Sequence, residues 1–426
     1  MNICAISTAQ GGAIGIVRVS GPQAIAITDR IFQGRQPLAD AKGYTLHFGK
    51  IVAADGSTFD EVLVSVFRAP NSYTGEDSVE ISAHGSSYIL QGICQLLVNH
   101  GCRMAGPGEY TQRAFLNGKM DLSQAEAVAD LIASQNAAQH RVAINQLRGG
   151  IATQLNLLRG KLLHLTSLLE LELDFADHEE LEFADRTELS AIAQQVESHL
   201  RQLSESFAQG NAIKNGIPVA IIGAPNVGKS TLLNQLLQDD KAIVSPIQGT
   251  TRDTIEDTIT IGGTLFRFID TAGIRQTSDV IENLGIERSI KAAAKADIIL
   301  LMRDDTSDYP DIPVKDHQTV IRIHNKSDKF QALNGTGMDW LYGELGKCLP
   351  EEGDNVIITN QRHKASLDHA LAAISRAREA MQAGLPGDLI AEDLRLCLHH
   401  LAEITGSAIT PDEILGNIFR NFCIGK

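Results

Sequence analysis

Glycines, a lysine and hydroxyl side chains follow one another between Gly223 and Thr231, in the sequence GAPNVGKST. The stretch matches the pattern G-x-x-x-x-G-K-[ST], whose fixed positions are filled by Gly223, Gly228, Lys229 and Ser230. Glycines in such a loop let backbone N–H groups surround phosphate oxygens, the lysine reaches the β- and γ-phosphates, and the serine hydroxyl ligates Mg²⁺. The stretch therefore predicts a binding site for a nucleoside triphosphate and Mg²⁺.

Two further motifs follow along the chain, Asp-Thr-Ala-Gly from Asp270 to Gly273 and Asn-Lys-Ser-Asp from Asn325 to Asp328. The carboxylate of Asp270 can hold Mg²⁺ through water, and the N–H of Gly273 can reach the γ-phosphate. The carboxylate of Asp328 can accept two N–H bonds from a guanine edge, a pair that adenine lacks. The order of the three motifs predicts a GTPase.

The residues around the γ-phosphate are less complete than these motifs. Thr251, in the stretch from Gln248 to Asp253, is the predicted second hydroxyl ligand of Mg²⁺. Ile274 stands where many GTPases have a glutamine that orients the attacking water, and an isoleucine cannot do this. The candidates for this role are carboxylates in the stretch from Asp279 to Glu287, and Glu282 lies at its centre. The alternative is an ordinary glutamate on a helix surface.

A positive charge at the transition state is a further requirement of GTP hydrolysis. Arg252 and Arg275 are possible sources, although either could simply face solvent. A bound monovalent cation could supply the charge instead, and Asn226 offers a carbonyl oxygen to hold it.

Strands and helices must bring these motifs together. Residues 217–222 read as a short buried strand before the phosphate loop, and leucines recur at helical spacing after it, at Leu232, Leu233, Leu236 and Leu237. Residues 264–269 and 319–323 are strand-like and precede the other two motifs. We therefore expect all three motifs at the C-terminal ends of strands in one sheet.

The chain before the phosphate loop changes character near Asp121. Residues 15–21, 62–67 and 78–82 are strand-like and residues 89–98 predict a helix, which indicates a mixed α/β domain. Ser123 and Glu126 then form a capping-box pattern, and helices are expected to about Phe207. The acidic stretch 174–180 is interpreted as a solvated loop or helix end and not as a metal site.

Turn signals set the limits of the nucleotide domain, at 209–212 and 215–216 before it and at 349–354 after it. Helices are expected again at 370–381 and 389–405. The predicted fold class is multidomain, α/β plus all-α. An N-terminal α/β domain covers 1–118, a helical domain covers 119–212 and 351–426, and a Ras-like P-loop GTPase domain is inserted at 213–350.

Composition indicates where the protein is found and how it could contact nucleic acid. The six cysteines form no C-x-x-C pair, and neither a basic, apolar leader nor a long apolar run is present, so we expect a cytoplasmic protein with reduced thiols and no membrane segment. The formal net charge is -15, with no obvious basic stripe. If nucleic acid is the substrate, we expect a partner protein to make many of the contacts with its phosphates.

Motifs inside and outside the nucleotide domain resemble those of the tRNA modification GTPase family called MnmE or TrmE. They are Gly-Thr-Thr-Arg-Asp at 249–253, Glu-Arg at 287–288, Pro-Asn-Ser-Tyr-Thr-Gly-Glu-Asp at 70–77, Arg-Ala-Phe-Leu-Asn-Gly-Lys at 113–119, Gln-Ala-Glu-Ala at 124–127 and the terminal Phe-Cys-Ile-Gly-Lys. The resemblance covers nearly the whole chain. It implies a folate-binding and dimerising N-terminal domain, a helical domain, and an inserted GTPase that dimerises through its switches around K⁺.

The resemblance also implies partners and a reaction. The partner would be MnmG, an FAD-containing protein, in a heterotetramer with a homodimer of this chain. Together they would use GTP and a folate such as 5-formyltetrahydrofolate to install carboxymethylaminomethyl or aminomethyl groups at C5 of the wobble uridine of certain tRNAs.

Site residues are carried over from the family by their matching positions. The resemblance assigns K⁺ to Asn226, Ser245, Ile247 and Thr250, and Mg²⁺ to Ser230 and Thr251. It assigns catalysis to Glu282 and Lys229, and folate binding to Arg18, Glu80, Lys119 and Lys426. The predicted GTP contacts are Asn226, Val227, Gly228, Lys229, Ser230, Thr231, Ser245, Pro246, Ile247, Gln248, Gly249, Thr250, Thr251, Asp270, Thr271, Ala272, Gly273, Asn325, Lys326 and Asp328. Cys423 matches the terminal cysteine of the family and could equally be a free thiol without a role.

The sequence departs from the family pattern in three places. Gln331-Ala332-Leu333 is the best match to the Ser-Ala motif on the guanine side, but it follows Asp328 immediately and has Gln where Ser belongs. The segment from Arg303 to Val314 is irregular, and residues 7–12 lack an expected proline. The GTPase domain is therefore shortened.

Two other functions share some of these residues. A ribosome-assembly or other regulatory GTPase of the Era type would have the same nucleotide motifs, but its C-terminus would carry a basic or GXXG-containing RNA-binding domain. A folate-dependent one-carbon transferase would have no use for a guanine motif. Neither explains the whole chain.

Overall fold

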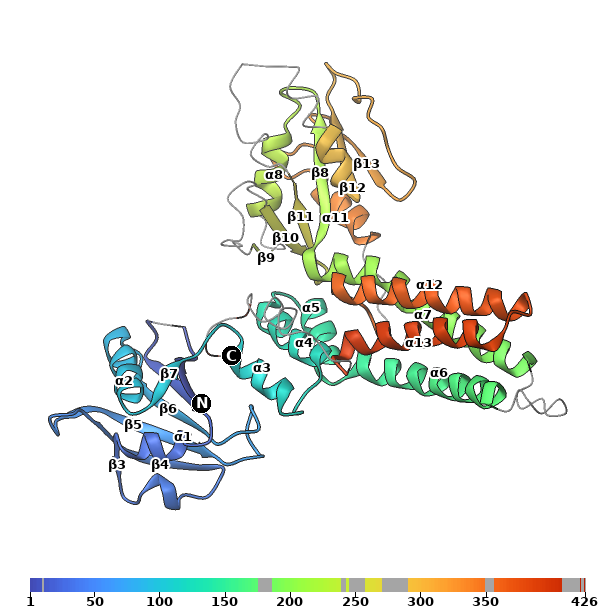
Figure 1. Cartoon of the computed structure of the whole chain (residues 1–426). Helices are drawn as coiled ribbons and strands as arrows, with labels where there is room; N and C mark the ends of the chain where they lie inside the picture. Colours follow the sequence, from blue (N-terminus) through green and yellow to red (C-terminus); the bar gives the residue numbers. More distant parts are fainter. Residues whose placement is uncertain are drawn as a thin grey trace. The chain divides into compact units, whose positions relative to one another are not determined.

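The computed structural model describes residues 1–9, 11–174, 186–238, 243–244, 257–269, 290–348, 356–407, 422 and 425. The chain forms two compact units, coloured along the sequence in Figure 1. The first comprises residues 1–129, 146–156 and 401–426, and the second comprises residues 130–145 and 157–400. Each unit is described by itself.

The first unit contains a seven-stranded sheet with the strand order β3-β4-β5-β6-β2-β1-β7. Its strands are β1 (Asn2–Ile6), β2 (Ile14–Ser20), β3 (Phe32–Gly34), β4 (Thr45–Val52), β5 (Thr58–Phe67), β6 (Ser78–His84) and β7 (Cys102–Met104). The described strand pairs are antiparallel apart from β1 with β7, which is parallel. The strands predicted at 15–21, 62–67 and 78–82 are confirmed.

Helices cover one face of this sheet. They are α1 (Ala24–Asp29), the short 3-10 helix η1 (Leu38–Asp40) and α2 (Ser87–Asn99), which confirms the predicted helix at 89–98. The apolar face of α2, with Leu90, Ile93 and Leu97 buried, joins one hydrophobic core with the inward-facing residues of the strands. Burial of alternate strand residues and of one helix stripe is what holds this layer together.

Helix α3 (Glu109–Leu116) begins after Gly108, whose φ of 64° places it in the left-handed region. The next helix, α4 (Leu122–Ala133), begins two residues earlier than a capping box at Ser123 would allow. Asp121 Oδ1 accepts from the N–H of Gln124 at 2.9 Å, and Gln124 Oε1 accepts from the N–H of Asp121 at 2.9 Å. The prediction of Ser123 and Glu126 as the box is therefore wrong, because Asp121 and Gln124 make the reciprocal pair and Ser123 is buried inside the helix.

The second unit contains a six-stranded sheet with the order β13-β12-β8-β11-β10-β9. The strands are β8 (Ile217–Gly223), β9 (Ile243–Val244), β10 (Asp257–Ile261), β11 (Thr264–Phe268), β12 (Ile298–Arg303) and β13 (Thr319–His324). Strands β13, β12, β8 and β11 run parallel, and β10 and β9 run antiparallel to their neighbours. The three strands predicted to precede the motifs are confirmed.

Strand β8 is the centre of this sheet. It pairs with β11 on one side and β12 on the other, so the chain reverses its direction of winding at the C-terminal end of β8. In open parallel sheets ligands bind at such a point. Helix α8 (Lys229–Gln238) follows β8 and buries Leu232, Leu233 and Leu236 in the core of the domain, as the leucine spacing predicts.

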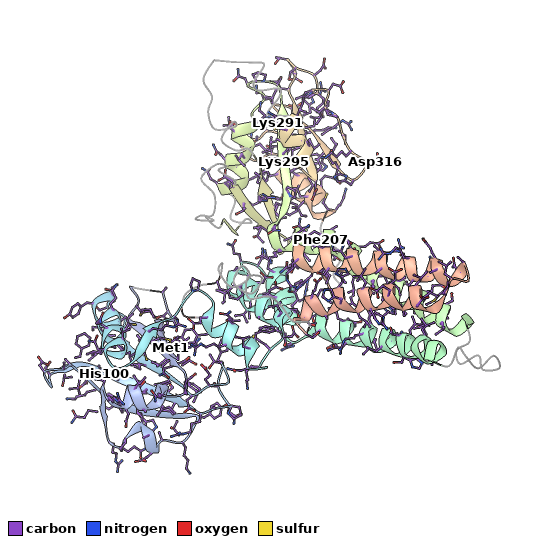
Figure 2. All side chains as sticks on the ribbon, viewed as in Figure 1. Met1, His100, Phe207, Lys291, Lys295 and Asp316 are labelled. Carbon is purple, nitrogen blue, oxygen red and sulfur yellow. The ribbon has the colours of Figure 1, made fainter. Side chains whose placement is uncertain are left out.

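The connection from β12 to β13, residues 304–318, contains no helix or strand. Parallel neighbours are usually joined by a helix. Here Tyr309 and Ile312 pack against apolar residues of the sheet from this connection. Asp316 lies further along it (Figure 2).

The helices of the second unit include α7 (Arg186–Asn215), α11 (Met338–Gly346) and α12 (Gln361–Gln382). Helix α7 runs through residues 209–212, so the turn predicted there is wrong. A Cβ on Gly210 would lie 2.0 Å from the carbonyl oxygen of Ile358, so this glycine permits close packing inside a helix. The turn predicted at 215–216 follows the end of α7, with Gly216 at φ 81°.

Four of the described helices include residues of both units: α4, α5 (Ala137–Leu147), α6 (Gly150–Asp174) and α13 (Gly387–Thr405). The helices predicted at 370–381 and 389–405 are confirmed by α12 and α13. Residues 175–180 of the acidic stretch and the whole of the turn predicted at 349–354 lie outside the described residues. Among the described residues, no helix has the length and apolar character needed to span a membrane.

Candidate nucleotide-binding site

The loop between β8 and α8 is shaped by close backbone approaches. A Cβ on Gly223 would lie 2.6 Å from the carbonyl oxygen of Met302, and one on Gly228 would lie 2.3 Å from Asn325 Nδ2. Gly228 has a φ of 99°, and its carbonyl accepts from the N–H of Leu232 at 2.9 Å, so it leads directly into α8. Neither position can carry a side chain unless Met302 or Asn325 moves, so both glycines are needed for the loop to lie this close to its neighbours.

Lys229, the first residue of α8, lies back across this loop. Its Nζ donates to the carbonyl oxygens of Gly223 and Ala224, both at 2.8 Å. Burial lowers the pKa of Lys229. A bound phosphate would raise the pKa of Lys229 again, because a nearby anion favours the charged lysine. Ser230, the next residue, is half-buried at the same helix N-terminus.

Asn325 ties the loop to the segment that follows Asp328. The side chain is buried, with 4% exposed, and its Nδ2 donates to the carbonyl of Val227 at 2.7 Å. Its Oδ1 accepts from the N–H of Ala332 at 2.9 Å. The structure therefore brings the predicted guanine-side segment 331–333 to the phosphate loop through one amide. Asp328 itself is exposed, in a turn held by Ser327 Oγ, which donates to the carbonyl of His324 at 2.8 Å.

Lys326 makes a second tie to the loop. Its Nζ donates to the backbone carbonyl of Asn226 at 2.8 Å and to Asp304 Oδ2 at 2.7 Å. Both Lys326 and Asn226 have positive φ values, 60° and 64°. The Lys326 ammonium and the hydroxyl of Thr306 hold the pKa of Asp304 well below its usual range.

Asp304 was missed by reasoning from the sequence. The signal that could have found it is a carboxylate directly after a buried strand next to β8, a position where polar residues of parallel sheets gather.

Many predicted contacts lie outside the described residues. They are Ser245, Pro246, Ile247, Gln248, Gly249, Thr250, Thr251, Asp270, Thr271, Ala272, Gly273 and Glu282, together with Lys426 and Cys423. Their roles stay predictions. Within the described part of the chain, the predicted Asn226, Val227, Gly228, Lys229, Ser230, Thr231, Asn325, Lys326 and Asp328 come from β8–α8 and from the end of β13.

The predicted folate residues lie in the first unit. Arg18 on β2 faces Glu80 on β6 in the register of the sheet, and Arg18 Nη2 lies 2.8 Å from Glu80 Oε1. Arg18 Nη1 also donates to the carbonyl of Gly425 at 3.2 Å, which brings the residue before Lys426 to this pair. Lys119 Nζ donates to the carbonyl of Pro70 at 3.0 Å.

Two tyrosines beside Arg18 were also missed. The guanidinium carbon of Arg18 lies 5.6 Å from the ring centroids of both Tyr73 and Tyr110. Tyr110 donates its hydroxyl to the carbonyl of Arg18 at 2.7 Å, and Tyr73 shares a hydrogen bond of 2.8 Å with Thr111. Burial raises the pKa of Tyr73. The tyrosine in the motif at 70–77 was the available signal.

Comparison with known proteins gives matches along the whole chain. A family model described as GTP-binding protein TrmE N-terminus matches residues 2–119, and one described as MnmE helical domain matches residues 122–423. The tRNA modification GTPase MnmE of Parabacteroides distasonis is 54% identical over 459 residues, covering 100% of this chain and 99% of the relative. That of Phocaeicola vulgatus is 52% identical, covering 100% and 98%. The cytosolic domain of the T. maritima FeoB iron transporter in a GDP form covers 44% of this chain and 96% of its own at 16% identity, with a TM-score of 0.21, too low to bear on the fold.

Proposed function

The chain belongs to the MnmE family of tRNA modification GTPases, and from this premise we propose that it hydrolyses GTP with K⁺ and Mg²⁺ to drive modification of the wobble uridine of tRNA. The observation that carries the proposal is the buried amide of Asn325, which joins the phosphate loop at Val227 to the guanine-side segment at Ala332. A site built in this way holds a triphosphate and a base together.

The described residues divide the work of binding. The loop N–H groups and Lys229 bind the phosphates, and the N-terminus of α8 adds its partial positive charge. Asp328 is exposed and can accept the N–H groups of guanine. Mg²⁺ would be held by Ser230 and by Thr251, and when bound it neutralises charge on the phosphates. Glu282 is the proposed residue that positions the attacking water.

The proposed K⁺ ligands include Asn226. Its backbone carbonyl accepts from Lys326 Nζ at 2.8 Å, whereas its side chain belongs to an exposed residue of the loop. The amide oxygen of the side chain is therefore the better ligand, because it need not compete with an ammonium group. Ser245, Ile247 and Thr250 complete the proposed set, and the cation would supply the positive charge of an arginine finger.

Exchange of the monovalent cation tests this function. Turnover of GTP by the purified protein is compared in KCl and NaCl of equal ionic strength, with ATP as the control nucleotide. We expect faster hydrolysis of GTP in KCl and little hydrolysis of ATP in either salt. Equal rates in both salts would refute the role of K⁺, and equal use of ATP would refute the guanine site.

A folate site around Arg18 is the second part of the proposal. Arg18 carries a fixed positive charge 5.6 Å from two aromatic ring centroids, and the neighbouring carboxylate of Glu80 can accept from ligand N–H groups. Such a set suits a ligand with carboxylates and a flat ring, and 5-formyltetrahydrofolate has both. The carbonyl of Gly425 holds the C-terminal tail at Arg18, so Lys426 is placed nearby by chain connectivity.

Removal of the tail separates this site from the GTPase. Deletion of residues 422–426 should weaken binding of 5-formyltetrahydrofolate by more than about tenfold, since a charge-assisted bond contributes about 1.5–3 kcal/mol. Lys50→Met, which removes an exposed cation from the same sheet, is the matched control and should bind normally. Calorimetric titration measures both. Normal binding by the truncated protein would show that the tail has no part in the site.

We further propose a homodimer and a complex with FAD-containing MnmG. Support for self-association comes from Leu46, Phe48 and Leu63, which are exposed on β4 and β5, with Phe48 directly opposite Leu63. An apolar patch of this kind favours a protein partner. The net charge of -15 supports a division of labour in which the partner provides most of the contact with tRNA.

A further inference from the structure

A buried carboxylate follows strand β12 and belongs to none of the three nucleotide motifs. Asp304 is 4% exposed and comes directly after Arg303, the last residue of the strand. Strand β12 pairs with β8 in a register that places Met302 beside Gly223, the first glycine of the phosphate loop. Asp304 is therefore held at the base of the loop by the sheet itself.

The two oxygens of this carboxylate have different partners. Oδ1 accepts from the N–H and hydroxyl of Thr306 at 3.1 and 2.8 Å and from the hydroxyl of Ser307 at 3.0 Å. These bonds close a local turn at the start of the connection to β13. Oδ2 lies 2.7 Å from the ammonium of Lys326. One oxygen thus fixes the carboxylate in place, and the other is available to the lysine.

Lys326 in turn contacts the phosphate loop through the carbonyl of Asn226. We propose that Asp304 is a positioning residue for the nucleotide site: it holds the ammonium of Lys326 against the carbonyl of Asn226 and so fixes the loop in the conformation that binds GTP. The inference rests on the proposed GTPase function and adds a residue outside the guanine and phosphate motifs. Asp304 would act through Lys326, which makes it a positioning residue and not a catalytic one.

Charge gives this arrangement its strength. The low pKa of Asp304 keeps the carboxylate ionised at neutral pH, which is the state that attracts an ammonium group. The side chain of Lys326 is 53% exposed, so the lysine would sample many rotamers without a fixed partner. The pair removes that freedom at the atom that contacts the loop.

The variant Asp304→Asn separates positioning from turn formation. An amide oxygen can still accept from Thr306 and Ser307, but the group that faces Lys326 becomes neutral. The matched control is Asp305→Asn, because Asp305 is the next residue, is 74% exposed at its side chain and pairs with His324. Thr306→Val is the control for the turn, since it removes one donor to Oδ1 and leaves Oδ2 unchanged.

The experiment measures dissociation rate and affinity of a fluorescent GDP analogue for the full chain. We expect Asp304→Asn to weaken binding by about tenfold, a size limited by the exposure of Lys326. Both controls should bind within about twofold of the wild type. Lys326→Met leaves Asp304 and its turn in place and tests the same contact from the other side. The double variant Asp304→Asn/Lys326→Met should bind no more weakly than Lys326→Met alone.

Three results would overturn the inference. Unchanged binding by Asp304→Asn would show that the pair is not needed. Equal weakening by Thr306→Val, or an additive loss in the double variant, would show that Asp304 acts by stabilising the turn. A wild-type chain that binds no GDP would refute the proposed function itself, and this outcome is distinct from a loss confined to Asp304→Asn.

Discussion

Gly228→Ala tests whether the contact between the phosphate loop and Asn325 controls nucleotide binding. The added Cβ would lie 2.3 Å from Asn325 Nδ2, and ordinary van der Waals contact begins at 3.4 Å. The amide must therefore move by roughly 1 Å. Its hydrogen bond to the carbonyl of Val227, now 2.7 Å, cannot survive that displacement.

The size of the expected affinity loss follows from the polar group that is left without a hydrogen-bond partner. Val227 is buried, so its carbonyl would lose its partner away from water, which costs about 1–3 kcal/mol. The free loop can relax away from the clash, whereas the bound state needs the original geometry, so this penalty falls on binding. We expect nucleotide affinity to fall by about tenfold to a hundredfold. Strain at positive φ adds a further 1–2 kcal/mol or so to the cost of alanine here.

Gly263→Ala is the control for that strain. Gly263 has a φ of 80° in the turn between β10 and β11, and a Cβ there would meet nothing within 4 Å. It should cost similar stability and leave nucleotide affinity unchanged. Equilibrium titration with a fluorescent GDP analogue, together with urea unfolding, measures both effects. Equal affinities for the two variants would refute the reasoning, because the clash with Asn325 would then have no consequence.

Three more predictions concern other residues. Asn226→Ala should abolish stimulation of GTP turnover by K⁺. Asn226→Gly, which accepts the φ of 64° without strain, should behave in the same way. Retained stimulation in the glycine variant would show that the Asn226 side chain is not a K⁺ ligand. Glu282→Ala should slow single-turnover hydrolysis by roughly two orders of magnitude with unchanged GTP affinity, and a normal rate would point to another carboxylate. Burial raises the pKa of Cys397 to about 12 from 9.0. Above pH 9 the folded chain therefore keeps a thiol proton that the unfolded chain loses. The free energy of unfolding should then fall by up to about 1.4 kcal/mol per pH unit. In urea unfolding, Cys397→Ala should lose less stability than the wild type between pH 8 and pH 10.5. An equal loss would show that the Cys397 thiol does not cause the pH dependence.

Local patterns were sufficient for the elements that carry the nucleotide motifs. Strand β8 and helix α8 were predictable because an apolar run, a glycine loop and leucines at helical spacing each have a short-range signature. The positions of Asn325 and Lys326 after a strand were predictable for the same reason. Their contacts with Val227 and Asn226 were not, because those depend on how β13 and β12 are placed beside β8.

Where local patterns failed, packing decided between alternatives that looked equal in sequence. Gly210 reads as a turn residue, yet it lies inside α7, where the lack of a side chain lets the carbonyl of Ile358 pass close to it. Ser123 and Asp121 both have cap chemistry, and burial of Ser123 leaves the cap to Asp121. The ion pair of Arg18 with Glu80 follows from the register of β2 and β6, which no local pattern encodes.

The guanine motif and the phosphate loop behave as one structural unit in this chain. Asn325 and Lys326 each donate a hydrogen bond to a loop carbonyl, at Val227 and Asn226, so both motif residues contact the phosphate loop directly. If guanine binds to Asp328 as proposed, it also restrains the proposed phosphate-binding loop through these two hydrogen bonds. Binding at one end of the nucleotide would then lower the ordering cost at the other, which is positive coupling without a large movement. The shortened connection from β12 to β13 begins at Asp304 and joins the same unit through Lys326.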